Sequence, residues 1–222
     1  MTNYHWGENM EIDELWKVLD NYKYIKVEDI PNIDLYMDQV TTFMDKRLRC
    51  ATRNPGEDKV LTKTMINNYA KNNLLPSPEK KKYSKEHMLL LIFIFYFKNI
   101  LSISDIQTLL KPMTEKYFKD DESFNLRDIY TEVFSLSKPE IESIRKDVKE
   151  KYDMAGNTFK DVPKEDREFL QQFSLICLLA CDVFIKKAMI ESMIDDMRKQ
   201  EETQKHGNEK KEAKTKNKPE KD

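Results

Sequence analysis

Apolar residues recur along this chain with the three- and four-residue spacing of helices, and no useful stretch alternates as a half-buried strand does. The spacing predicts a short amphipathic helix over residues 11–22 and a longer helix over 33–48, with Pro31 between them. An Asn-Pro-Gly sequence inside 50–59 predicts a loop after the second helix. The pattern therefore indicates an all-α fold.

The segment 61–110 has the clearest start and stop signals in the chain. Thr62 is expected to cap a helix over 63–72, because its hydroxyl can accept a hydrogen bond from the first turn. Asn72 and Asn73 can end that helix, since asparagine tolerates the left-handed conformation, and two prolines that follow prevent its continuation. The sequence predicts a short, isolated polar helix here.

A second capped helix follows at once. Ser84 is expected to cap a helix over 85–99, although the fourth position lacks the acid of a full capping box. This helix is apolar nearly all round over 88–97, which is typical of a helix buried on most of its faces. Ser102 opens a further helix, which the sequence predicts to stop near Pro112.

The remainder of the chain is also expected to be helical. The spacing predicts helices over 123–134, 139–152 and 164–198, and the last has a centre that is apolar on several faces. It lacks a sustained heptad, so we expect it to pack in a bundle, within the domain or against a partner subunit. The segment 199–222 has no large apolar residue and is predicted to be a disordered, charged tail.

Charge is distributed unevenly along the chain. The formal net charge is -2, yet residues 60–112 carry 8 Lys against 3 acids. A basic module inside an acidic chain is typical of local contact with phosphates. The alternative is a solvated lysine-rich surface, which is common on exposed helices.

The cysteines and the apolar runs bear on location. The three cysteines, Cys50, Cys177 and Cys181, form no disulfide framework and indicate a reducing compartment, so a cytoplasmic protein is expected. Cys177 and Cys181 lie in an apolar helix, where buried thiols are the default expectation and a metal site the weaker alternative. The longest apolar runs fall well short of the ~20 residues of a membrane-spanning helix.

The helix predicted over 63–72 has the two faces of a recognition helix. Met65, Ile66 and Tyr69 recur at a spacing suited to an apolar back. Asparagine suits adenine edges in the major groove, and lysine suits guanine edges or phosphate. The residues left for a DNA-facing front are Lys63, Thr64, Asn67, Asn68 and Lys71. The alternative is an ordinary exposed helix surface.

The order of motifs in 61–110 resembles the DNA-binding domain of MerR-family transcription regulators, a winged helix-turn-helix. The residues that carry the resemblance are Leu61-Thr62, Ile66, Tyr69, Asn73-Leu74-Leu75, Tyr83-Ser84-Lys85-Glu86-His87-Met88, Ser102-Ile103-Ser104-Asp105-Ile106 and Leu109-Leu110. The resemblance implies that Tyr69 lies at the groove edge and that Lys80, Lys81 and Lys82 act as a small basic wing on the DNA backbone. The chain departs from the family at Asn67, where the family has Arg, and at Asn68, where it has Tyr.

A closer resemblance joins three short runs. IPNIDLYMDQV (30–40), TKTMINNY (62–69) and KKKYS (80–84) are similar to the bacterial domain-of-unknown-function family 1836 (DUF1836), whose members are regarded as MerR-like. The resemblance implies an all-α fold with a MerR-like winged helix-turn-helix and a helical C-terminal region.

Together these features predict four regions. They are an N-terminal helical extension at 1–32, a helix-turn-helix DNA-binding domain at 33–112, a helical dimerisation region at 113–198 and the tail at 199–222. The expected function is a transcription regulator that binds double-stranded DNA as a homodimer, with no cofactor, no metal and an unknown effector. The alternative is a helical adaptor that keeps the fold without binding DNA. An enzyme is not expected, because no acid–base or nucleophile constellation occurs.

Overall fold

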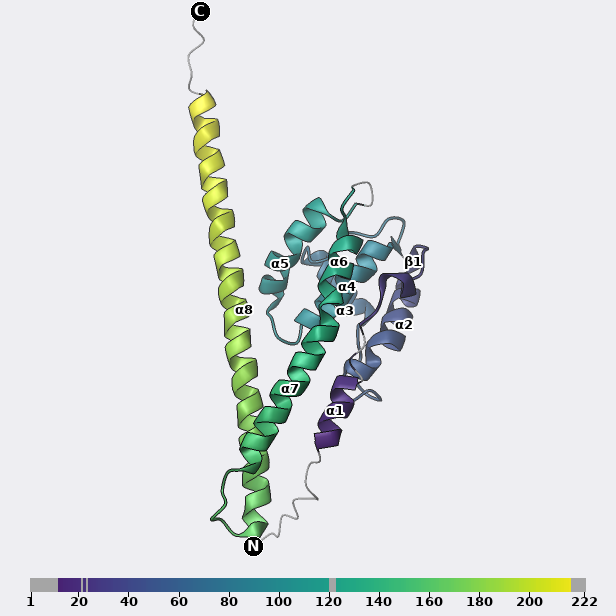
Figure 1. Cartoon of the computed structure of the whole chain (residues 1–222). Helices are drawn as coiled ribbons and strands as arrows, with labels where there is room; N and C mark the ends of the chain where they lie inside the picture. Colours follow the sequence, from purple (N-terminus) through teal and green to yellow (C-terminus); the bar gives the residue numbers. More distant parts are fainter. Residues whose placement is uncertain (1–11, 21, 23, 120–122, 217–222) are drawn as a thin grey trace, which may run out of the picture.

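The computed structural model describes the backbone of residues 12–20, 22, 24–119 and 123–216, with side chains as far as Thr203. The described part is mostly helical, as the sequence predicts, with one two-stranded sheet (Figure 1). Its elements are α1 (Ile12–Asp20), β1 (Leu35–Tyr36), α2 (Met37–Leu48), α3 (Lys63–Lys71), β2 (Lys82–Tyr83), α4 (Lys85–Phe97), α5 (Ile103–Lys116), α6 (Leu126–Ser135), α7 (Ser137–Gly156) and α8 (Lys164–Lys216), with short 3-10 turns at Val27–Asp29 and Arg49–Ala51.

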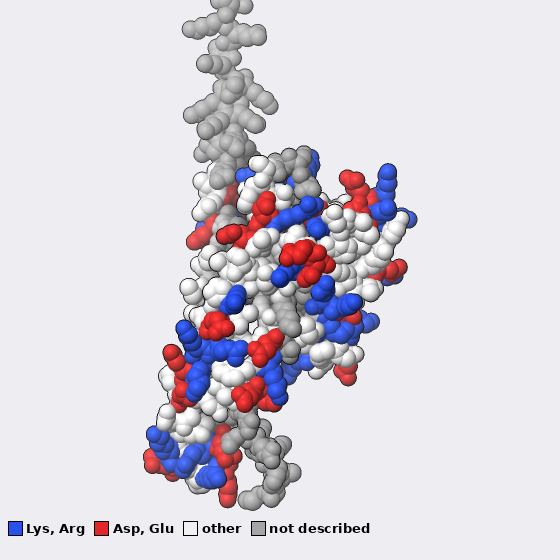
Figure 2. Space-filling view, turned by 45° about the vertical axis from the view of Figure 1, so that its right-hand side comes forward, with Lys and Arg blue, Asp and Glu red and all other residues white. Residues whose placement is uncertain are grey.

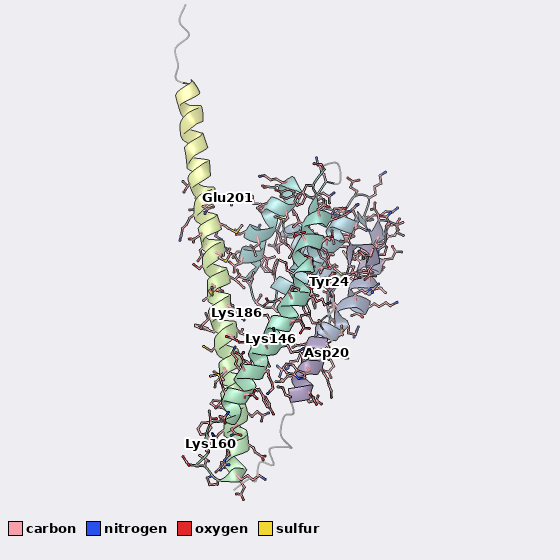
Figure 3. The ribbon with its side chains drawn as sticks, viewed as in Figure 1. Asp20, Tyr24, Lys146, Lys160, Lys186 and Glu201 are labelled. Carbon is pink, nitrogen blue, oxygen red and sulfur yellow. The ribbon has the colours of Figure 1, made fainter. Side chains whose placement is uncertain are left out.

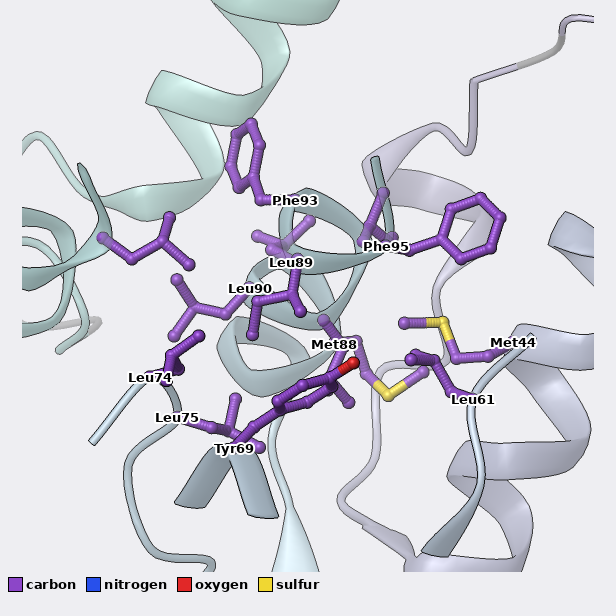
Figure 4. Packing of buried hydrophobic residues seen from close by; sticks show 14 of the residues in the cluster. Met44, Leu61, Tyr69, Leu74, Leu75, Met88, Leu89, Leu90, Phe93 and Phe95 are labelled. Carbon is purple, nitrogen blue, oxygen red and sulfur yellow. The ribbon is translucent and has the colours of Figure 1, made fainter. Parts of the chain in front are cut away.

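Helix α4 forms the centre of the core. It is buried over the ten consecutive residues from Glu86 to Phe95, because helices pack around it on several sides. Met44 of α2, Ile66 of α3, Ile106 of α5 and Tyr130 of α6 belong to the same buried cluster, part of which is drawn in Figure 4. Burying side chains of this kind contributes about 1.5–3 kcal/mol each. The all-round apolar pattern over 88–97 thus predicted the central helix.

Residues 25–30, which fall in the expected N-terminal extension, pack in this core. Ile25 and Ile30 are 3% and 2% exposed and lie in the main cluster. The hydroxyl of Tyr130 donates a 2.6 Å hydrogen bond to the carbonyl oxygen of Ile25. A distant helix thus completes the hydrogen bonding of a segment that the sequence assigned to the N-terminal extension.

The boundary expected at Pro112 is also displaced. Pro112 lies inside α5, which continues to Lys116. Proline removes one backbone donor, but the helix persists here because Leu110 is buried and Met113 packs against the core. The compact module also extends into α6, where the Arg127 guanidinium pairs with the buried Glu86 carboxylate at 2.6 Å.

Helix α8 is a long rod along one side of the molecule (Figure 1). In its first half it packs on α7, where Lys151 and Asp182 form a 2.6 Å ion pair. Further along it meets α5 near Glu201, whereas Lys160 marks the loop that joins α7 to α8 (Figure 3). The predicted end at residue 198 and the predicted disorder beyond it are wrong for 199–216, which continue the helix. Lysine, glutamate, alanine and glutamine favour helix and can extend it without packing.

The cysteines differ from the expectation. Cys50, Cys177 and Cys181 are all exposed. Cys177 and Cys181 were expected to be buried because the surrounding sequence is apolar, but both lie on parts of α8 that stay exposed to solvent. An apolar helix is therefore left with much of its surface open.

Candidate nucleic-acid interface

Helix α3 begins and ends at the residues that the sequence predicts. The Met65 amide donates a 3.1 Å hydrogen bond to the Thr62 hydroxyl, which makes Thr62 the N-cap. At the other end Asn73 adopts a left-handed conformation with φ of 55°, and the Leu74 amide donates to the Tyr69 carbonyl at 2.9 Å. This is the hydrogen bond of a Schellman-type end, which turns the chain sharply away.

The two faces of α3 separate as predicted, with one correction. Ile66 is fully buried, and Tyr69 is only 7% exposed and belongs to the core. Tyr69 was expected at the edge of the DNA groove, but it lies three residues after Ile66 and so shares its inward face (Figure 4). Burial also raises the pKa of the Tyr69 hydroxyl. The exposed residues of the outward face are Lys63, Thr64, Asn67, Asn68 and Lys71.

The start of α2 connects α3 to the lysine segment. Lys63 forms an ion pair with Asp38 in the first turn of α2. Two residues earlier, the Tyr36 ring lies 5.4 Å from the Lys82 ammonium. The β1–β2 pairing holds that contact, because Tyr36 pairs directly with Lys82 in the sheet register. The first turn of α3 and the lysine segment therefore flank the same short stretch of chain.

The lysine segment is a tight turn. The Lys82 amide donates to the Glu79 carbonyl at 2.8 Å, and the two central residues, Lys80 and Lys81, have φ of 48° and 66°. Two consecutive left-handed residues define the type I′ turn that is typical of β-hairpins. Left-handed conformations cost lysine about 1 kcal/mol each, so this turn is strained. Lys80 and Lys81 project into solvent, whereas Lys82 is half-buried against Tyr36.

Immediately after β2, a histidine stabilises the start of α4. The Ser84 amide donates a 3.0 Å hydrogen bond to Nδ1 of His87, so the imidazole takes the place of the acid in a capping box. The ring packs edge-on against Tyr83 and Phe118, at 5.4 and 4.8 Å between ring centres. Burial lowers the pKa of His87, and its Nε2 has no hydrogen-bond partner among the described residues. A neutral His87 thus fixes the chain that leads out of the lysine turn.

The far end of α3 is tied to α5 and, through it, to α8. Gln107 Nε2 donates to the Asn72 carbonyl at 2.9 Å. On the same helix, the Asp105 carboxylate forms a 2.6 Å ion pair with the Arg198 guanidinium of α8. A polar hollow of about 490 Å³ lies between the three elements, bordered by residues that include Asn73 and Glu201. The position of α3 is therefore coupled to that of the C-terminal helix.

Basic side chains near this face have acidic neighbours. In the view of Figure 2, acidic and basic side chains are interspersed over the visible surface, without a large area of one sign. Asp38 places an acid directly beside Lys63. Sequence reasoning also missed Tyr36, which is 53% exposed next to Lys82. Only the strand pairing reveals that neighbour, because the two residues are far apart in the sequence.

Two other features are absent from the part of the chain that the structure describes. There, no three His, Cys, Asp or Glu side chains lie together in a way that could hold a metal ion. Nor does that part contain a helix with the length and apolar character needed to cross a bilayer.

No curated protein and no solved structure matches the chain. The model of one protein family matches the chain, and that family is described as a domain of unknown function (DUF1836). The match spans residues 25–133, from the buried Ile25 to the middle of α6, and so coincides with the compact module built around α4. Residues 25–133 of the chain are therefore similar to the DUF1836 family.

Proposed function

We propose that this chain is a regulator that binds double-stranded DNA through the outward face of α3 and the lysine turn. The observation that carries the proposal is the division of α3. Its polar and basic residues are all exposed, whereas Ile66 and Tyr69 anchor it to the core. A helix held from behind with a short polar front is what entry into a major groove requires.

The order of elements supports the same proposal. A short strand leads into α2, then α3, then a tight basic turn whose strand pairs back with the first one, then the central α4. This is the order expected of the MerR-like winged helix-turn-helix. Lys80 and Lys81 would contact phosphates at the tip of the turn, and Asn67 and Asn68 would reach base edges. Tyr69 is removed from the contact set, because its ring is buried.

Selection and sequencing of bound genomic fragments at ~50 mM salt tests the proposal, because phosphate contacts are strongest at low salt. Replacing Lys80, Lys81 and Lys82 together by alanine should weaken binding to all sequences alike and flatten its salt dependence. The matched control is alanine at Lys138, Lys146 and Lys164, three exposed lysines outside the proposed face. The regulator function is contradicted if the parent binds no fragment, or if the control weakens binding equally.

Two single substitutions test the face itself. Asn67→Ala should relax the preference for one DNA sequence while leaving the salt dependence intact. Asp38→Asn should strengthen binding, because it removes the acid that pairs with Lys63 and would repel phosphate. Loss of binding in Asp38→Asn would contradict the proposed position of Lys63.

The alternative is a protein-interaction module that keeps this fold. The acid Asp38, which pairs with Lys63 beside the proposed face, favours it. Such a module would show no salt-dependent affinity for duplex DNA, so the same binding series separates the two functions.

A further inference from the structure

The polar hollow between α3, α5 and α8 has the size and the lining of a binding site for a small molecule. Its volume of about 490 Å³ falls within the ~300–1,000 Å³ that is usual for small-molecule pockets. Two side-chain amides, two threonine hydroxyls, one lysine and two glutamates line it. These groups come from three elements that are far apart in the sequence, so only the folded chain brings them together.

Helix α5 supplies the floor of the hollow. Gln107, Lys111 and Thr114 follow one another at spacings of four and three residues, which places them along one side of the helix. All three are half-buried, whereas Glu115 at the edge of this row is exposed. The opposite, apolar side of α5 packs in the core, so the row is held in a fixed position.

The charged groups of the hollow leave one carboxylate without a cation. Lys111 of α5 forms an ion pair with Glu201 of α8, the residue labelled in Figure 3. Glu201 raises the pKa of Lys111, with a smaller contribution from Glu115, so the lysine keeps its charge. Glu115 itself forms no ion pair with any side chain that the structure describes. The lining therefore has an excess of negative charge, which favours a ligand with a positive group.

The neutral groups of the hollow offer acceptors rather than donors. Gln107 donates from its amide nitrogen to the Asn72 carbonyl at 2.9 Å, and its amide oxygen accepts no hydrogen bond from the described residues. The Thr114 hydroxyl donates to the Lys111 carbonyl at 2.9 Å, which leaves its oxygen able to accept. A primary ammonium has three donors and no acceptor, so it complements this arrangement.

We infer that the hollow binds a small polar molecule through a primary ammonium group. The Glu115 carboxylate pairs with the ammonium, and Glu201 and Gln107 supply further acceptors. Hydrogen bonds of this charge-assisted kind are about twice as strong as neutral ones. Free amino acids and aliphatic diamines both carry the group. They differ in that the carboxylate of an amino acid would pair with Lys111, whereas a diamine would compete with Lys111 for Glu201.

A ligand at this position contacts the residues that join the three helices. Glu201 belongs to the contact between α8 and α5, and Gln107 holds the Asn72 carbonyl at the end of α3. Binding should therefore alter the position of α3 relative to α8. The consequence for DNA affinity rests on the proposed function, but the binding of the ligand does not. A failure to bind amines and a failure to bind DNA are separate results.

Isothermal titration calorimetry of the full chain without DNA tests the site. The probes are 1,4-diaminobutane and L-alanine, and 1,4-butanediol is the uncharged control of matched length. We expect saturable binding of at least one ammonium compound and none of the diol. Tighter binding of the diamine or of the amino acid identifies which of the two supplies the group. The inference is overturned if neither ammonium compound binds, or if the diol binds as tightly.

Substitution of Glu115 tests the position of the ammonium. Glu115→Gln keeps the size of the side chain but removes its charge, so it should weaken binding of the ammonium compound by about tenfold or more. The matched control is Glu142→Gln, which alters an exposed acid on α7 outside the hollow and should bind like the parent. Circular dichroism should show the same helix content in all three proteins. Equal binding by Glu115→Gln and the parent would place the ligand elsewhere.

Substitution of Lys111 separates the two sources of the ammonium. Lys111→Met should weaken binding of L-alanine, because it removes the cation that faces the carboxylate. The same change should strengthen binding of 1,4-diaminobutane, because it removes the lysine that shares Glu201. Weaker binding of the diamine by Lys111→Met would contradict the role of the two glutamates.

Discussion

The compact module at residues 25–133, which matches the DUF1836 family, and the α7–α8 pair differ in how their apolar residues are covered. In the domain, α4 is surrounded, and ten consecutive residues from Glu86 to Phe95 are buried. In α8, by contrast, Val183, Phe184, Met189 and Met193 are between 61% and 74% exposed. The apolar residues of α4 are thus buried, whereas those of α8 named here are exposed to solvent. The domain is a self-sufficient core, whereas the helix pair has surface that is suited to a partner.

The largest contrast should appear when one side chain is shortened in each region. Leu90→Ala should lower the free energy of unfolding by about 3 kcal/mol, because Leu90 is fully buried and the deletion leaves a cavity. Met193→Ala should change it by no more than about 0.5 kcal/mol, because Met193 is 69% exposed. Urea denaturation of the two variants measures both values. Equal losses would contradict the difference between the regions.

Breaking the ion pair that joins α6 to α4 should have the next largest effect. Burial alone would raise the pKa of Glu86, but hydrogen bonds from Ser84, the backbone and Arg127 lower it overall. Arg127→Ala should destabilise the chain by about 2 kcal/mol, because it leaves a buried carboxylate without its cation. Adding Glu86→Gln should recover part of that loss in thermal or urea unfolding. If the double variant is less stable than Arg127→Ala, the buried charge is not the cause.

Relieving the strained turn should have a smaller effect of opposite sign. Lys81→Gly should stabilise the chain by about 1 kcal/mol, because glycine adopts a φ of 66° without the steric cost that lysine bears. The same substitution should weaken DNA binding, since it removes one proposed phosphate contact. Lys82→Gly is the control, because Lys82 is not among the residues with positive φ and should gain no stability. A Lys81→Gly variant that is less stable than the parent would contradict the turn geometry.

The smallest expected effect is a pH dependence of the domain. Burial lowers the pKa of His87 below its usual value, so the unfolded chain takes up a proton first as the pH falls through ~6.5. The free energy of unfolding should therefore decline below about that pH, and less so in His87→Gln, which can still accept from Ser84. Glu86 does not interfere, because its lowered pKa puts its titration below this range. Identical pH profiles for parent and variant would contradict a neutral, buried His87.

Much of the domain could be predicted from local signals. Thr62, Ser84 and Ser102 all precede helices at the predicted residue, because an N-cap needs only a side-chain oxygen and the next turn of the same chain. Asn73 ended α3 for the same local reason. The predicted boundaries of elements differ from the observed ones where contacts with distant residues outweigh the local signal. Pro112 did not stop α5, and residues 25–30 joined the core.

The candidate site divides in the same way. The sequence determined that α3 has one apolar and one polar face, that the lysines follow it, and that the central helix is buried, because these follow from periodicity and capping within a few residues. Only the tertiary structure decided that Tyr69 faces the core, that Tyr36 and Asp38 adjoin the lysines, and that the cysteines and many apolar residues of α8 are exposed. Those outcomes depend on which element covers which face, and packing between residues far apart in the chain sets that choice.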